Sequence, residues 1–315
     1  MDIQKILDRK IKELPPGSHV DGLRAVKSHI DSAIRHLTRG QEEPDETLFT
    51  DVIFRCNQAF EGSIKEAYRV IAGKDPQNVK PYEIEQFLGS SNILRKKVLD
   101  QFTIYRREWR NPSAHDYTLD FDEDEALLAI VSVVAFAIVL CDQINGKLAF
   151  NDAAAATPSS KFTNEEKKLP LLDLVTKAAF SFATSYVDVT GPTKSHAHDY
   201  YRLEGALAGY LTSKFAINPD IKVEQNKKFS SSAADIIVQR DHEKIVIELK
   251  RTSNKSTIKS ILNSAVTQAA LYLHEDNVVG AVALLFAIHG GSYIITPGSG
   301  ALSKAVRIIS PSTEK

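Results

Sequence analysis

The first half of the chain has the apolar spacing of amphipathic helices. Segment 22–38 carries apolar residues at intervals of three and four positions, namely Leu23, Val26, Ile30, Ala33, Ile34 and Leu37. Segment 51–73 has the same spacing and ends at Gly73, a residue typical of helix C-termini. Two more helices are expected over 91–110 and 126–142, and no segment alternates as a strand does. Residues 1–150 are therefore predicted to form an all-α, antiparallel bundle of four or five helices.

The pattern changes after residue 150. Residues 151–169 are small, polar and charged, which is typical of a linker. Residues 170–315 are predicted to form a second, α/β domain. Its expected elements are helices near 170–186 and 196–213, strands at 221–229, 234–239 and 245–251, a helix at 257–275, and strands at 277–288 and 292–297.

The hairpin 234–251 carries charges where a core strand usually carries more valine. Alternation along the second strand puts Val246, Glu248 and Lys250 on one face. The first strand begins with Asp235, which the hairpin brings alongside. Adjacent carboxylates repel each other, and a divalent cation such as Mg²⁺ (or Mn²⁺) removes that cost because it binds oxygen ligands. A nearby ammonium orients or deprotonates a metal-bound water, so these residues suit phosphodiester hydrolysis.

These residues resemble the PD-(D/E)xK nucleases, which have the restriction-endonuclease-like fold. The match consists of Asp235, twelve residues, then Glu248-Leu249-Lys250, within the order helix, three strands, helix, strand. Upstream, "YYRLEGALAGYL" contains Glu204, where the family often has an acidic residue. Downstream, "TQAALYL" contains Gln268 and Tyr272, the Q-x-x-x-Y pattern of the RecB-like branch. The resemblance covers about residues 195–290 and implies a mixed central sheet.

The resemblance also implies a role for each residue. Asp235, Glu248 and the Leu249 carbonyl would bind the metal, and Lys250 would handle the nucleophilic water. Glu204 would assist, while Gln268 and Tyr272 would position the substrate or the lysine. Ala234 stands where the proline of the motif is expected. The E-x-K spacing alone is uninformative, because "NEEKK" at 164–168 contains it twice in a charged, exposed run.

The first half contains a second motif, "REWRNPSAHDY" at 107–117. Arg110 and His115, with four residues between them, resemble the R-x4-6-H motif of HEPN domains, and Asn111 fits the polar residue after the arginine. The resemblance covers about residues 20–145 and implies a helical domain that dimerises. In ribonuclease members, histidine acts as general base or acid on the RNA 2′-hydroxyl and arginine stabilises the phosphate, without metal. Arg106, one turn earlier, would add a phosphate contact.

The alternative for this motif is structural. Pro112 is expected to break the helix, Asn111 and Ser113 to cap the next segment, and His115 to hydrogen-bond across the bundle. The HEPN-like domain would then serve for dimerisation or binding alone. The pair His196 and His198 has H-x-H spacing but no third ligand nearby, so it is interpreted as surface residues or caps.

Composition adds limits to these hypotheses. The chain has 315 residues, 43% hydrophobic and 25% charged, with a net charge of −1, as in a globular protein. No export signal is evident, and the apolar run 126–141 is shorter than the roughly 20 residues of a membrane span. Cys56 and Cys141 do not indicate a disulfide framework or metal site. A cytoplasmic, non-membrane protein is expected. The second half has a small excess of basic residues, which is compatible with a nucleic-acid surface.

The sequence thus favours a Mg²⁺-dependent deoxyribonuclease that works in prokaryotic defence against phages and plasmids. The setting rests on the resemblance, as do a homodimer formed through the HEPN-like domain and a defence partner encoded in the same operon. One alternative is a metal-independent HEPN ribonuclease, with a C-terminal domain that binds nucleic acid. The other is a dimerising, non-catalytic adaptor that binds nucleic acid, DNA or RNA.

Overall fold

The computed structural model describes the chain except residues 1, 44, 92, 116–119, 187–198, 230–232, 254, 289–290 and 313–315. The chain divides into two compact units, one over Met1–Lys147 and the other beginning at Leu148. The first unit is helical, and the second combines helices with a mixed sheet, as the sequence pattern predicts.

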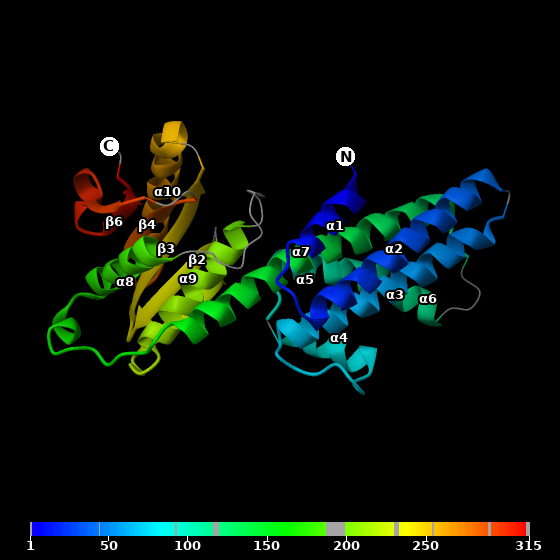
Figure 1. Ribbon diagram of the computed structural model, residues 1–315, viewed down its shortest axis with the longest axis horizontal. Coiled ribbons are helices and arrows are strands. Elements are labelled where there is room, and N and C mark those ends of the chain that lie inside the picture. The colour runs from blue at the N-terminus through cyan, green and yellow to red at the C-terminus, as the bar shows by residue number, and fades with distance from the viewer. Residues whose placement is uncertain are drawn as a thin grey trace. The chain divides into compact units, whose positions relative to one another are not determined.

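The first unit is built around two long helices that pack lengthwise, α2 and α3 (Figure 1). Its helices are α1 (Ile3–Lys12), α2 (Ser18–Glu42), α3 (Thr47–Val70), α4 (Pro81–Ser90), α5 (Lys96–Tyr105), α6 (Asn111–His115) and the first part of α7 (Glu123–Ala156). An aromatic cluster fills its centre, because the Phe60 ring lies 4.8 Å from Tyr105 and 5.4 Å from Phe136, centroid to centroid. The predicted stripe of α2 is buried at Leu23, Val26 and Ile30.

Gly73 ends the α3 segment as its sequence position predicts. Its φ of 65° is in the left-handed region that glycine adopts without strain. The next amide, of Lys74, donates to the Tyr68 carbonyl at 3.1 Å, so one of the free carbonyls at the helix end is satisfied.

The prediction that Pro112 breaks the helix is wrong. Helix α5 continues through the π-helix η1 (Arg106–Arg110) directly into α6, which contains Pro112 as its second residue. In the wide turn the Asn111 amide donates to the Arg106 carbonyl, five residues back. In a π turn an amide bonds to the carbonyl five residues back instead of four. This wider turn comes just before the proline, which has no N–H to donate. Ser113 is not a cap, since its hydroxyl donates to the Trp109 carbonyl at 2.7 Å within the helical run.

Helix α7 extends beyond the predicted range of 126–142 and reaches Ala156. Residues 151–156, which begin the predicted linker 151–169, are therefore helical, because the alanines at 153–156 have the highest helix propensity. Among the described helices, α7 is the one long and apolar enough to cross a membrane, and 56% of its most apolar window is buried in the protein. That burial agrees with the core helix of a soluble protein.

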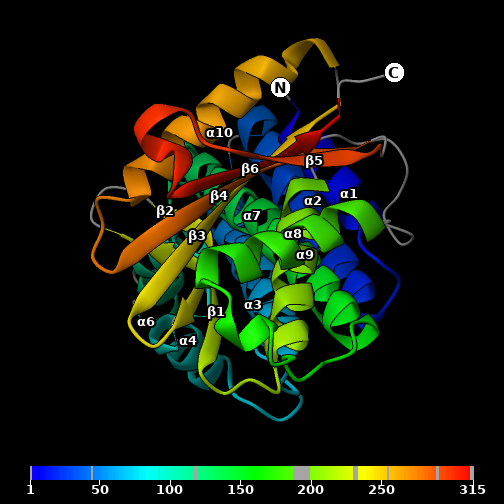
Figure 2. The same cartoon turned by 90° about the vertical axis from the view of Figure 1, so that its left-hand side faces the viewer.

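The second unit is one six-stranded sheet with helices on both faces (Figure 2). Its strands are β1 (Ile221–Lys228), β2 (Ala233–Arg240), β3 (Glu243–Thr252), β4 (Val278–Ala287), β5 (Tyr293–Pro297) and β6 (Val306–Pro311), in the spatial order β1-β2-β3-β4-β6-β5. Strands β1, β2 and β3 are antiparallel, β3-β4 and β4-β6 are parallel, and β5-β6 is antiparallel. The pattern of the sequence did not predict β6, which lies between β4 and β5.

The two sheet faces separate by side-chain alternation. Ile236, Ile247 and Leu249 are in the core beneath α8 (Leu171–Ser185) and α9 (Asp199–Phe215). Ile237 and Val246 lie on the other face, in the core beneath α10 (Ile258–Tyr272). Figure 2 shows these helices on opposite sides of the sheet. Residues two positions apart on a strand share a face, so Glu248 and Lys250 lie on the same face as Val246, beneath α10.

Helix α9 is held close to the end of α7. A Cβ on Gly209 would lie 2.2 Å from the Phe150 carbonyl oxygen, which is backbone and has no side-chain freedom. Glycine is thus required for this approach. The contact fixes α9, and α9 carries Tyr200 and Glu204 toward the sheet.

Candidate metal and catalytic site

The strands β2 and β3 separate at one end of their ladder. Their pairing runs from the Arg240–Glu243 pair to the Ile236–Ile247 pair. Beyond that point β2 stays paired with β1, and β3 stays paired with β4. We call this place the fork and define it as residues 233–235 of β2 and 248–250 of β3.

Asp235 and Glu248 stand at the fork opposite each other. Each is the first residue beyond the last ladder pair, Ile236–Ile247. The negative charge of Asp235 raises the pKa of Glu248, and the Asp235 carboxylate accepts from the amide of Leu249, the next residue after Glu248. The structure therefore brings together the two carboxylates that the sequence pattern selected.

Both oxygens of Asp235 accept hydrogen bonds. The Leu249 backbone amide donates to Oδ2 at 2.8 Å, and the Tyr200 hydroxyl donates to Oδ1 at 2.8 Å. In a continuous ladder the Leu249 amide would donate to a β2 carbonyl, so the aspartate side chain replaces a backbone acceptor here. Tyr200 comes from α9, and Leu249 from β3.

Both oxygens of Glu248 also have partners. The Lys250 ammonium lies 2.5 Å from Oε1, and the Tyr272 hydroxyl lies 3.3 Å from Oε2. The Glu248 side chain is only 1% exposed, whereas Lys250 remains 28% exposed. Burial, and next the negative charge of Asp235, raise the pKa of Glu248 to about 7, although the bonds from Lys250 and Tyr272 oppose the shift.

Gln268 and Tyr272 project from successive turns of α10 into this set of groups. The Gln268 side-chain oxygen accepts from Lys250 Nζ at 3.2 Å, and its amide nitrogen donates to the Tyr272 hydroxyl at 3.3 Å. The Tyr272 hydroxyl also donates to the Ala233 carbonyl at 2.9 Å, which ties α10 to β2. The single phenol proton thus faces two acceptors, and the Ala233 carbonyl is nearer than Glu248 Oε2.

Glu204 is buried in α9, one turn after Tyr200, with 1% exposure. Its charge acts on Tyr200, whose pKa is raised far above its usual value by burial and then by the charges of Asp235, Glu204 and Glu248. The upstream acidic residue thus lies within electrostatic range of the fork. Tyr200 was missed at the level of sequence, although its i, i+4 spacing from Glu204 is a signal that a helical pattern offers.

The residues at the fork fit Mg²⁺ or Mn²⁺ by their chemistry. In the part of the chain that the structure describes, no group of three or more His, Cys, Asp or Glu side chains is placed to hold a metal. Mg²⁺ needs no such cage, because it keeps several waters and binds through one or two carboxylates together with substrate phosphates. The Leu249 carbonyl lies on the same strand edge as its amide, which faces Asp235. Buried Glu248, half-buried Asp235 and the Leu249 carbonyl are therefore the groups at the fork that would hold a divalent cation, which would relieve the repulsion between the two carboxylates.

The HEPN-like motif of the first unit has a different setting. Arg110 forms ion pairs with Glu61 (Nη2 to Oε1, 3.5 Å) and with Glu85 (Nε to Oε1, 3.6 Å). Glu85 is 3% exposed, and burial raises its pKa while the charges of Arg110 and Arg106 lower it. Arg110 thus compensates a buried carboxylate inside the bundle.

The other residues of that motif are only partly described. Asn111 is exposed at the start of α6. The backbone of His115 is helical, but its side chain lies outside the described part, as do His196 and His198. Arg106 lies over the Phe102 ring, with its guanidinium carbon 5.5 Å from the ring centroid. The meeting of Arg110 and His115 across a dimer therefore stays a prediction.

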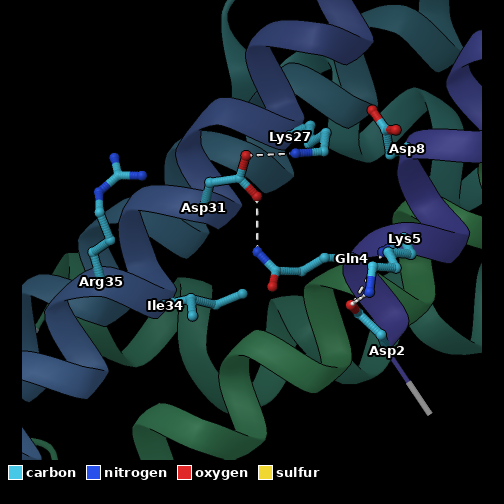
Figure 3. A pocket seen from close by; sticks show the side chains of 8 residues that line it. All are labelled: Asp2, Gln4, Lys5, Asp8, Lys27, Asp31, Ile34 and Arg35. Carbon is cyan, nitrogen blue, oxygen red and sulfur yellow. Dashed lines mark hydrogen bonds and ion pairs between the residues drawn. The ribbon is translucent and has the colours of Figure 1, made fainter.

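A charged depression of about 460 Å³ lies between α1 and α2 (Figure 3). Its groups are paired among themselves, since Asp31 accepts from Gln4 at 2.9 Å and from Lys27 at 2.6 Å. Asp2 similarly pairs with Lys5 at 3.1 Å. These mutual pairs give the depression a mainly structural character.

Comparison of the chain with protein-family models, with curated proteins and with solved structures finds no match.

Proposed function

We propose that the second unit is a Mg²⁺- or Mn²⁺-dependent nuclease that hydrolyses phosphodiester bonds of DNA. The observation that supports it is the convergence at the fork of two facing carboxylates, a lysine and the pair on α10 that contacts them. Solvated charges on a sheet face are exposed and adaptable. Glu248 is instead buried, with its pKa raised to about 7, and such perturbed groups concentrate at functional sites.

Asp235, Glu248 and the Leu249 carbonyl would hold the cation. When bound, the cation supplies charge neutralisation and lowers the pKa of its water. Hydrolysis requires that a water oxygen attack phosphorus, that one P–O bond break, and that the departing oxygen take up a proton. Both carboxylates would then carry negative charge, because Glu248 would lose its proton when the cation binds.

Lys250 would serve as a positive hydrogen-bond donor beside the reacting phosphate. In the structure its ammonium donates to Glu248 and Gln268, and it keeps partial exposure toward solvent. If Glu248 held the cation, the Lys250 ammonium would give up its bond to Oε1 and would have one N–H available for the substrate. Gln268 holds the ammonium near the fork during that exchange, so the charge stays where negative charge develops.

The test is cleavage of single- and double-stranded DNA by the full chain with Mg²⁺, with EDTA, and with single variants. Lys250→Ala is expected to lose activity by about 100-fold or more, and EDTA to abolish it. Lys167→Ala is the matched control, because Lys167 occupies the same E-x-K spacing in an exposed segment. Equal cleavage by Lys250→Ala and Lys167→Ala would contradict the proposal.

The same assay separates the alternatives. RNA cleavage that survives EDTA and fails in His115→Ala would favour a HEPN ribonuclease. Nucleic-acid binding without cleavage under either condition would favour the adaptor. No described contact of Arg110 favours catalysis over its ion pairs with Glu61 and Glu85. The cytoplasmic location, the HEPN-mediated homodimer, the defence setting and the operon-encoded partner stay predictions.

A further inference from the structure

We propose that Tyr200 is a positioning residue that sets the cation affinity of the fork by orienting Asp235. The inference rests on the proposed function, because it takes Asp235 as a ligand of Mg²⁺ or Mn²⁺. Tyr200 lies outside the D…E-x-K and Q-x-x-x-Y motifs. It comes from α9, which covers the sheet face opposite α10.

Two donors on different elements hold the Asp235 carboxylate. The Tyr200 hydroxyl on α9 reaches Oδ1 and the Leu249 amide on β3 reaches Oδ2, both at 2.8 Å. A carboxylate that accepts a hydrogen bond at each oxygen cannot rotate freely about χ2. A carboxylate oxygen has two lone-pair sites, so accepting one hydrogen bond does not prevent it from binding a cation.

A neutral donor suits this task better than a charged one. An ammonium or guanidinium on Asp235 would repel an incoming divalent cation, whereas a phenol adds no net charge. In the structure the Tyr200 phenol supplies such a neutral donor, 2.8 Å from Oδ1 of Asp235.

Tyr200 is also rigidly supported. Its ring packs against the core beneath α8 and α9 and meets the Tyr201 ring edge to face, with centroids 5.7 Å apart. Helix α9 is anchored through buried Leu203 and Leu207. Support of this kind on a ligand typically changes metal affinity by about 10- to 100-fold when it is removed.

The test is a titration of Mn²⁺ into the full chain without nucleic acid, with free Mn²⁺ followed by electron paramagnetic resonance. Tyr200→Phe removes one oxygen atom and is expected to weaken binding by about 10- to 100-fold. The matched control is Tyr210→Phe on the same helix. The Tyr210 ring packs at a tilt against Phe182, with centroids 5.5 Å apart, and the variant should bind as the wild type does. Asp235→Asn should abolish binding at the fork.

A second measurement distinguishes positioning from simple structural damage. In DNA cleavage, Tyr200→Phe should need about 10- to 100-fold more Mg²⁺ for half-maximal rate yet approach the wild-type rate at saturation. Damage to the fold would lower the rate at every Mg²⁺ concentration. Should Tyr200→Phe melt below the assay temperature, Tyr200→His and Tyr200→Leu are compared, and only the former, which keeps a donor, should retain measurable affinity.

The outcomes separate the two proposals. Mn²⁺ binding that is lost in Asp235→Asn but unchanged in Tyr200→Phe would overturn the role of Tyr200 alone. Mn²⁺ binding unchanged in both Asp235→Asn and Glu248→Gln would overturn the metal site, and with it the proposed function.

Discussion

Asp235 and Leu249 are joined across the fork by a hydrogen bond of 2.8 Å, in which the backbone amide of one strand donates to the side chain of the other. Strands can separate only if the polar groups they leave behind find new partners, because a buried amide without one costs free energy. Asp235 therefore closes the end of the β2–β3 ladder as well as facing Glu248. The same carboxylate thus supports the fold and is a proposed ligand of the cation.

Asp235→Ala should lower the free energy of unfolding by about 1–3 kcal/mol, because it leaves the Leu249 amide and the Tyr200 hydroxyl without their acceptor. Asp235→Asn keeps an acceptor oxygen and should cost less. Urea denaturation of the metal-free protein measures both. An alanine variant as stable as the wild type would show that the aspartate does not support the fork.

The metal-free protein should become less stable as pH rises from about 5 to 8. The pKa of Glu248 is raised from 4.5 to about 7, so between these values the folded chain binds more protons than the unfolded chain. The stability that Glu248 contributes as a neutral group is full below pH 4.5 and is lost as pH rises through 7. A shift of this size corresponds to about 3 kcal/mol.

Glu248→Gln removes this titration, so the pH slope over that range should flatten in urea denaturation at several pH values. Saturating Mg²⁺ at pH 8 should stabilise the wild type, by about 2.7 kcal/mol at a hundredfold excess over its dissociation constant. A wild-type stability that rises steadily from pH 5 to 8 without metal would contradict the assigned shift.

Arg110→Ala should destabilise the first unit by about 3 kcal/mol, because it leaves Glu85 buried without its cation. Adding Glu85→Gln should recover much of that loss, since a neutral amide costs less to bury. Circular dichroism during denaturation measures both variants. If Arg110 served catalysis alone, the single variant would keep wild-type stability and the second change would have nothing to restore.

Gly209→Ala should destabilise the second unit by more than about 2 kcal/mol, because the added methyl group meets the Phe150 carbonyl at 2.2 Å. Gly89→Ala is the control: it is also helical, but its Cβ would meet only the Phe102 ring, at 3.8 Å. That variant should be neutral or stabilising by up to about 1 kcal/mol. Thermal denaturation of both tests whether close approach makes Gly209 necessary.

Local periodicity predicted much of the candidate site. Two-residue alternation put Glu248 and Lys250 on one face, and four-residue spacing put Gln268 and Tyr272 on one side of their helix, which the structure shows. Such patterns are reliable because they follow from the geometry of a single element. Strand β6 was not predicted, and its place in the sheet comes from pairing with β4 and β5.

The sequence by itself determined the helical first unit, the order of elements in the second from α8 to β5, and the charged residues that the hairpin brings near one another. Only the tertiary structure decided that β2 and β3 separate at Asp235, that Tyr200 reaches it from the opposite layer, and that Arg110 is paired with Glu61 and Glu85. These relationships join residues far apart in the chain. Their partners are chosen by packing and by the need to satisfy buried polar groups, which no short stretch of sequence specifies.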